Sequence, residues 1–221
     1  MKTPVNAKSL KQHLTYSWWK YVLVLLAGTF LVDLLFTVTS PKVPEDKKVE
    51  FYVYGYGNSD LLSEYMEKVR TEEMPEMEEM RAVFLLPDDT YGPMQLTTYL
   101  AVGEGDLYLL PREQFLPLSG DGAFVALEED AELMDIFNQA GTDLKRGWRT
   151  DQEGETHLVG IPQSFLPGLA SYCAADDGFI CVLPNGGNTE NTLRFLRILC
   201  RDLITEPEPV PEAEAEAAEQ P

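Results

Sequence analysis

Polar and aromatic side chains follow the first two apolar runs of the central sequence, VEFYVYGY and RAVFLL. Each group comes just before a predicted helix, where free backbone amides and the positive end of the helix dipole can hold a polar group. Tyrosine rings beside such groups add flat apolar faces, a combination common in small-molecule sites. The same residues also form ordinary turns and helix caps, so a purely structural interpretation stays open. The candidate ligand-binding residues are Tyr56, Asn58, Ser59, Asp89, Thr90 and Tyr91.

Sequence motifs of the common catalytic sites are missing from the chain, which contains no G-x-S-x-G, H-E-x-x-H or phosphate-binding loop. His157 lies in a predicted strand and is interpreted as a structural or surface residue. The acidic clusters Glu128-Glu129-Asp130 and Asp176-Asp177 lack the ligand spacing of a calcium loop, and we interpret them as solvated turns. We therefore expect a non-catalytic protein without a cofactor or a metal site.

Two of the three cysteines, Cys173 and Cys181, flank a predicted hairpin turn at residues 174–178. Opposed on paired strands outside the cell, their thiols could form a disulfide. The alternative is that both are reduced and pack as small apolar side chains. Cys200 lies on the apolar face of a predicted helix and is expected in the core.

The charge of the chain is strongly negative and unevenly distributed. Seventeen Lys and Arg stand against 37 Asp and Glu, for a net charge of −20 over 221 residues. Residues 1–48 carry net +4, residues 49–205 net −18, and residues 206–221 net −6. A nucleic-acid binder needs clustered basic side chains for the phosphate backbone, so this balance argues against that class.

One apolar segment is long enough to cross a bilayer. Residues 21–38 contain a single charge, and as a helix they would span about 27 Å. Tyr16, Trp18, Trp19 and Tyr21 gather at its start, as aromatic rings do at membrane interfaces. A signal-peptidase site is missing, and Thr29 stands where a lipoprotein would have its acylated cysteine. We predict a retained transmembrane helix and hence a single-pass protein of the cell membrane.

The orientation of this helix follows from its flanking lysines. Four precede the span and three follow it, which favours a cytoplasmic N-terminus and an extracytoplasmic main domain. Asp33 is the one charge inside the span. It either pairs with a base on a neighbouring membrane helix or lies near enough to the outer end to reach the headgroups.

Beyond the span, strand and helix patterns alternate. Strand, helix, strand, helix, strand in this rhythm predicts an α/β fold with a mostly parallel sheet and flanking helices. Residues 147–162 predict a hairpin that turns at Gln152-Glu153-Gly154. Strands are expected at 49–56, 81–86, 106–110 and 179–184, and helices begin after the cap Ser59, at Pro93, and after Asn188 or Thr189.

Five segments follow from these patterns. They are a basic cytoplasmic segment (1–20), the transmembrane helix (21–39), a linker (40–48), the extracytoplasmic α/β domain (49–205) and a disordered acidic tail (206–221).

The order of elements in residues 49–203 resembles the first lobe of extracellular solute-binding proteins, which have the type 2 periplasmic-binding fold. The similar stretches are VEFYVYG, RAVFLL, GEGDLYLL, GDGAFVALEE, VGIPQS and NGGNTENTLRFLRIL. The resemblance implies binding of a small solute. The chain departs from the family in size: about 155 residues form one lobe, whereas proteins of the family hold their ligand between two lobes.

Two functions remain in competition. The first is a membrane-anchored module that binds a small solute, neutral or cationic because the domain is so acidic. The second is a structural or interaction subunit that docks on another membrane protein and binds no small molecule. The first predicts a polar cavity at the carboxyl ends of the strands. The second predicts an exposed apolar patch.

Overall fold

The computed structural model describes residues 7–39, 43–87, 90–120, 122–184 and 188–204, so the predicted acidic tail and Asp89 lie outside the described residues. The chain divides into two compact units, residues 1–42 and 43–221. Each is described here by itself.

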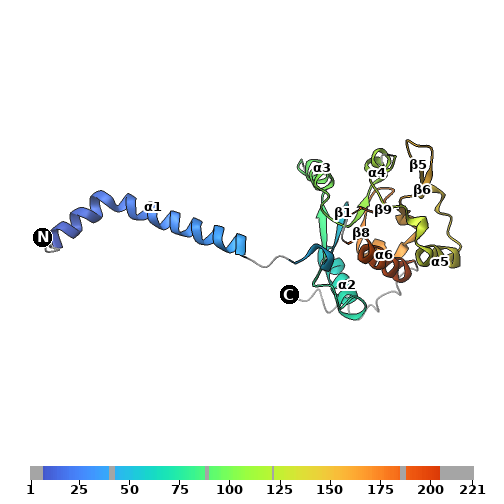
Figure 1. The fold of residues 1–221 in the computed structure, drawn as a ribbon, viewed down its shortest axis with the longest axis horizontal. Coiled ribbons are helices and arrows are strands. Elements are labelled where there is room, and N and C mark those ends of the chain that lie inside the picture. Colours follow the sequence, from blue (N-terminus) through green and yellow to red (C-terminus); the bar gives the residue numbers. More distant parts are fainter. Residues whose placement is uncertain (1–6, 40–42, 88–89, 121, 185–187, 205–221) are drawn as a thin grey trace, which may run out of the picture. The chain divides into compact units, whose positions relative to one another are not determined.

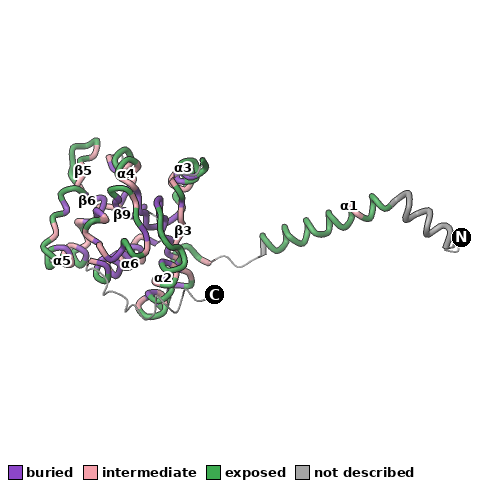
Figure 2. The backbone as a smooth tube through the Cα atoms, turned by 180° about the vertical axis from the view of Figure 1, so that it is seen from behind, coloured by how far each residue is buried: buried purple, intermediate pink, exposed green. Residues whose placement is uncertain are grey.

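The first unit is the helix α1 (Ala7–Thr39). Its segment Trp18–Thr37 is long and apolar enough to cross a membrane, with a mean hydropathy of 1.8, and none of it is buried within the structure. Residues 18–37 of α1 are exposed except for the half-buried Val22, and Figure 2 colours this part of the helix accordingly. A signal sequence near an N-terminus has the same length and composition. The structure therefore confirms an apolar helix and leaves its retention as a prediction.

The second unit is built on a five-stranded sheet in the order β3-β1-β4-β9-β7 (Figure 1). Strand β1 pairs in parallel with β3 and β4, whereas β9 is antiparallel to both β4 and β7. Only β9 therefore runs against the other strands of this sheet. The strands are β1 (Lys48–Tyr54), β3 (Glu79–Leu85), β4 (Leu107–Leu110), β7 (Ile161–Pro162) and β9 (Phe179–Val182).

The other elements join or cover these strands. The helices are α2 (Ser59–Glu72), α3 (Gly92–Val102), α4 (Arg112–Ser119), α5 (Ala131–Ala140) and α6 (Thr189–Leu203). Two small antiparallel pairs are β2 (Tyr56–Gly57) with β8 (Cys173–Ala174), and β5 (Trp148–Thr150) with β6 (Thr156–Leu158). Short 3₁₀ helices lie at Glu45–Lys47, Leu127–Glu129, Leu144–Gly147, Gln163–Phe165 and Pro167–Ser171.

The central strands are buried on both faces, and each face has its own core. Phe51 and Val53 of β1 point into a core shared with α2, α5 and α6, whereas Tyr52 and Tyr54 point into a core shared with α3 and α4. Alternate residues of β4 and β9 divide in the same way, as the twofold side-chain period of a strand requires. The result is three layers, with helices on both faces of the sheet (Figure 1).

The α/β class and the order of the main elements are confirmed, and two local predictions are corrected. The cap of α2 is Asn58, one residue before the predicted Ser59, and its side chain accepts hydrogen bonds from the amides of Asp60 and Leu61. Asn188 is the residue that precedes α6, but its side chain makes no capping bond there. The hairpin β5–β6 lies where the turn residues predicted it.

The side chain of Asn188 instead joins a buried polar cluster at the amino end of β4. The Asp106 carboxylate accepts hydrogen bonds from the Glu50 amide (2.8 Å) and from Asn188 Nδ2 (3.0 Å). The Asp106 amide donates back to the Glu50 carbonyl, and its carbonyl accepts from the Leu183 amide. Glu50, Asp106 and Asn188 are each about 99% buried. This cluster ties β1, β4, the end of β9 and the start of α6 together.

Replacing Asp106 with Ala is expected to destabilise the domain by about 3 kcal/mol, because two buried donors lose their acceptor. Urea denaturation of the fragment 43–221 measures this change. Asp135→Ala, at an exposed position of α5, is the control and should change stability by less than about 0.5 kcal/mol. Equal urea midpoints for Asp106→Ala and Asp135→Ala would show that the buried polar cluster does not stabilise the domain.

Candidate functional site

A cavity of about 660 Å³ lies at the carboxyl ends of the three parallel strands β3, β1 and β4. Tyr54, Gly55 and Tyr56 line it from the end of β1, Pro87 from the end of β3, and Pro111 and Arg112 from the end of β4. The turn between β8 and β9 supplies a further wall through Ala175, Asp176 and Asp177, and α4 contributes Glu113, Gln114 and Leu116.

The chain direction explains why a cavity forms here. From β1 the chain passes through α2 to β3 on one side, and it then returns through α3 to β4 on the other side. Helix α2 covers one face of the sheet and α3 covers the other. The loop from β1 to α2 and the loop from β3 to α3 therefore diverge. In open α/β sheets ligands bind at such a switch point, beyond the carboxyl ends of the strands.

Two glycines allow the rim of the cavity to form. A Cβ atom on Gly55 would lie 2.3 Å from the Ala174 carbonyl oxygen, and one on Gly57 would lie 2.3 Å from that of Tyr172. Only glycine permits this close approach of β2 to β8. Between them, the side chain of Tyr56 is half exposed and lines the cavity.

The wall opposite Tyr56 carries both signs of charge. Asp177 forms ion pairs with Arg112, at 3.7 Å, and with Arg146. Asp177 has φ +45°, the left-handed region that an L residue adopts at some cost, and it is the only described non-glycine residue with positive φ. The Arg112 amide also donates to the Asp176 carbonyl. These contacts attach the β8–β9 turn to the start of α4.

Aromatic stacking supports the arginines behind this wall. The rings of Phe115 and Phe179 stack with their centroids 4.4 Å apart. The Arg149 guanidinium lies 5.3 Å from the Phe115 centroid, and that of Arg146 lies 5.5 Å from Phe179. Burial, followed by the charges of Arg112 and Arg146, lowers the pKa of Arg149. The stack thus orients Arg146 toward Asp177.

Of the residues predicted from sequence to bind a ligand, Tyr56 lines this cavity. Asn58 caps α2, and Ser59 is the exposed first residue of that helix. Thr90 and Tyr91 are exposed in the turn before α3. Asp89 lies outside the described residues. The structure therefore places the two predicted loops at the expected edge of the sheet, but their helix-start residues are not part of the cavity lining.

The β8–β9 turn is the part of the site that the sequence did not reveal. Asp176 and Asp177 are exposed, as the interpretation of a solvated turn expects, and both also line the cavity. The other acidic cluster also makes specific contacts: Asp130 caps α5, and Glu128 is hydrogen bonded to His157. The run Asp176-Asp177-Gly178 is the one sequence signal for a turn here, and it does not reveal what the turn contacts.

The predicted hairpin partners Cys173 and Cys181 lie on strands of different sheets. Cys173 in β8 is opposite Gly57, whereas Cys181 in β9 is opposite Tyr108. The two side chains belong to the separate cores on either face of the main sheet, and both are free thiols. Burial raises the pKa of Cys173 to about 12 and that of Cys181 well above its ordinary value. The structure therefore agrees with the second interpretation, in which Cys173 and Cys181 are both reduced and buried.

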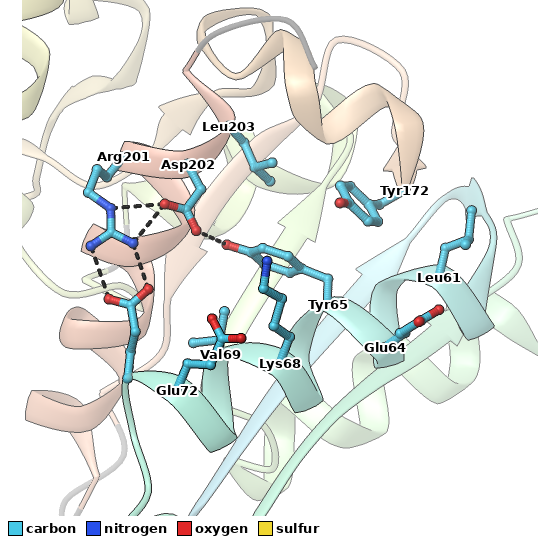
Figure 3. A pocket seen from close by; sticks show the side chains of 11 residues that line it. Leu61, Glu64, Tyr65, Lys68, Val69, Glu72, Tyr172, Arg201, Asp202 and Leu203 are labelled. Atoms are coloured by element: carbon cyan, nitrogen blue, oxygen red, sulfur yellow. Dashed lines mark hydrogen bonds and ion pairs between the residues drawn. The ribbon is translucent and has the colours of Figure 1, made fainter. Parts of the chain in front are cut away.

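A second cavity, of about 810 Å³, lies between α2 and the end of α6 (Figure 3). The Arg201 guanidinium makes two hydrogen bonds to the Glu73 carboxylate, at 2.7 and 3.0 Å, and two to the Asp202 carboxylate, at 2.7 and 2.9 Å. The Tyr65 hydroxyl donates to Asp202 at 3.1 Å. Because these groups satisfy one another, we interpret this cavity as a structural junction between the two helices.

A third cavity is an apolar groove between α3 and α4, of about 710 Å³. Its lining includes Leu96, Leu100, Leu118 and Leu183 together with Val102, which is 67% exposed.

No protein-family model and no curated protein matches this chain. Among solved structures, an extracellular solute-binding protein family 1 from Alicyclobacillus acidocaldarius is similar, with 16% sequence identity and a TM-score of 0.36. The match covers 56% of this chain and 28% of that one. The likeness at this level assigns neither a family nor a ligand.

The pair Glu73–Arg201 predicts a pH-dependent contribution to stability. The hydrogen bonds from Arg201 lower the pKa of Glu73 below its ordinary value of 4.5. A carboxyl group with a lowered pKa in the folded state stabilises the fold above its unfolded pKa, and the gain is lost as pH falls through the folded value.

Glu73→Gln should therefore destabilise the fragment 43–221 by about 0.5 kcal/mol at neutral pH, the scale of a partly exposed ion pair, and by less at about pH 3. Urea denaturation at the two pH values measures this difference. Glu72→Gln is the matched control, because Glu72 is exposed on the same helix turn. If Glu73→Gln lowers the free energy of unfolding equally at both pH values, the ion pair between Glu73 and Arg201 does not contribute to stability.

Proposed function

We propose that this chain is a membrane-anchored, extracytoplasmic binding module that holds a small solute at the carboxyl ends of β3, β1 and β4. The observation that carries the proposal is the cavity of about 660 Å³ at this switch point. Its volume lies within the range of about 300–1,000 Å³ that small-molecule sites occupy. The resemblance of the strand and helix order to a solute-binding lobe supports the same role.

The charge around the cavity supports a neutral or cationic solute. Among the lining residues, Arg112 stands against the carboxylates of Glu113, Asp176 and Asp177. The domain that carries the cavity has a net charge of −18, so an anion would also be repelled at longer range. The ring of Tyr56 offers a flat face to an apolar or sugar-like surface of the solute.

A non-catalytic role is part of the proposal. The lining residues that the structure describes include no serine, cysteine or histidine, so they offer no Ser–His or Cys–His pair. Acid–base chemistry would rest on carboxylates, one of which, Asp177, already pairs with two arginines.

An interaction subunit is the second candidate function, and the apolar groove between α3 and α4 favours it. Exposed apolar surface of this kind is typical of protein contacts. In this alternative the groove docks on another membrane protein, and Asp33 pairs with a basic residue on a neighbouring span.

We expect the full-length chain to stay in the membrane fraction after extraction with alkaline carbonate, because Trp18–Thr37 is long and apolar enough to cross the bilayer. Intact-mass measurement of that fraction should include residues 1–39. A mature species that begins near residue 41 would show that the segment is a cleaved signal sequence.

We expect a neutral sugar or an amine to raise the melting temperature of the fragment 43–221, since a ligand that binds only the folded state stabilises it. Tyr56→Ala should weaken that ligand about tenfold, which corresponds to about 1.4 kcal/mol. A thermal-shift screen followed by calorimetric titration measures both effects.

Tyr91→Ala is the matched control, because Tyr91 is also an exposed tyrosine at this edge of the sheet but does not line the cavity. The Tyr91→Ala variant should bind the ligand with the affinity of the wild type. Loss of binding in Tyr91→Ala alone would move the site to the turn before α3. A screen without any stabilising solute would favour the interaction subunit.

A further inference from the structure

The hairpin β5–β6, which does not line the solute cavity, brings together three side chains that can ligate a metal ion (Figure 1). One ligand atom from each of Asp151, Glu155 and His157 lies within 4.8 Å of the other two. Two carboxylates and an imidazole supply oxygen and nitrogen donors, the set that borderline divalent cations accept. All three side chains are at least partly exposed, so an ion can reach them from solvent.

The turn holds the first of these ligands in place. Asp151 Oδ1 accepts hydrogen bonds from the amides of Glu153 and Glu155, both at 2.9 Å. The Asp151 amide also donates to the Glu155 carbonyl at 2.8 Å, and Gly154 takes the positive φ that this turn needs. Both side-chain bonds use Oδ1, which leaves Oδ2 as the oxygen for a metal ion.

A fourth residue, outside the hairpin, orients the imidazole. Glu128 Oε1 lies 2.6 Å from His157 Nδ1, and Glu128 Oε2 accepts from the Leu158 amide at 2.8 Å. Because Nδ1 is held by a carboxylate, Nε2 is the nitrogen that faces Glu155, at 3.7 Å from its carboxylate. A carboxylate on the far nitrogen of a histidine is the usual support of a metal-binding imidazole, since it sets the tautomer and the ring orientation.

We propose that Asp151, Glu155 and His157 bind a divalent transition-metal cation such as Zn²⁺, with Glu128 as the positioning residue. Three protein ligands leave a coordination position for water. This ligand set disfavours Ca²⁺ and Mg²⁺, because both ions take oxygen ligands and would gain nothing from the imidazole. The bound ion would join the two ends of the hairpin turn and, through His157 and Glu128, fix the hairpin to the 3₁₀ helix Leu127–Glu129.

The test is a calorimetric titration of the full-length, metal-free chain in detergent with Zn²⁺ at about pH 8. Protons compete with the ion for the imidazole nitrogen, so the titration is run well above the ordinary pKa of histidine. The expected result is binding of one ion that raises the melting temperature. Addition of Co²⁺ should give a visible absorption band from the protein-bound ion.

Four variants locate the site. His157→Gln and Glu155→Gln should each weaken Zn²⁺ binding at least about tenfold and remove the Co²⁺ band. Glu128→Gln should weaken binding by about 10- to 100-fold while the band remains at high Co²⁺, as expected for a residue that acts on a ligand. Glu153→Gln is the matched control: it removes a charge from the same turn, and binding should not change.

The Glu155→Gln variant changes an exposed turn residue, so its fold is not at risk. Equal affinity in Glu155→Gln and Glu153→Gln would show that Zn²⁺ responds only to the acidity of the surface, and it would overturn the proposal. So would a wild-type chain that binds no ion.

Discussion

The buried carboxylate of Asp106 is the constraint on which the α/β domain depends. A carboxylate this deeply buried is costly unless its oxygens accept hydrogen bonds, and here the Glu50 amide and Asn188 supply them. These partners belong to β1 and to the residue before α6, which are 138 positions apart in the chain. Satisfying one charge therefore fixes the register of β1 against β4 and the entry of α6. With the amino edge of the sheet held in this way, the loops at the carboxyl edge are free to form a cavity.

Local pattern was enough to predict the elements around β1, because each of their determinants lies within a few residues. The apolar run VEFYVYGY, the turn after it and the proline at the start of α3 predicted the order of strands and helices, and that order predicted the parallel unit β1, β3 and β4. The direction of β9 could not be predicted. It depends on the pairing of residues 179–182 with β4, which lies 69 to 75 positions earlier, and no short-range rule encodes that contact. The cap of α2 differed by one residue, since Asn58 and Ser59 are both good caps.

The place of the candidate site was predictable and its composition was not. Strand ends in a parallel sheet meet at one edge whatever their side chains, so the edge follows from the order of elements. The wall made by Asp176 and Asp177 arises from the β2–β8 pair, which two glycines permit and which joins residues about 117 positions apart. The same long-range pairing separated Cys173 from Cys181. Both differences come from contacts between distant segments, where sequence periodicity carries no information.

The architecture also limits how tightly a solute can be held. The described cavity walls come from one edge of the sheet and the start of α4, and Tyr56 at the rim is half exposed. A ligand there would keep part of its surface in water, whereas tight small-molecule sites bury most of it. Affinity depends on the contacts that remain after desolvation, so a cavity that leaves its ligand partly in water favours weak and rapidly reversible binding. Such binding would suit the proposed role of a membrane-tethered module for an abundant solute. It suits tight capture only if a partner closes the open side of the cavity.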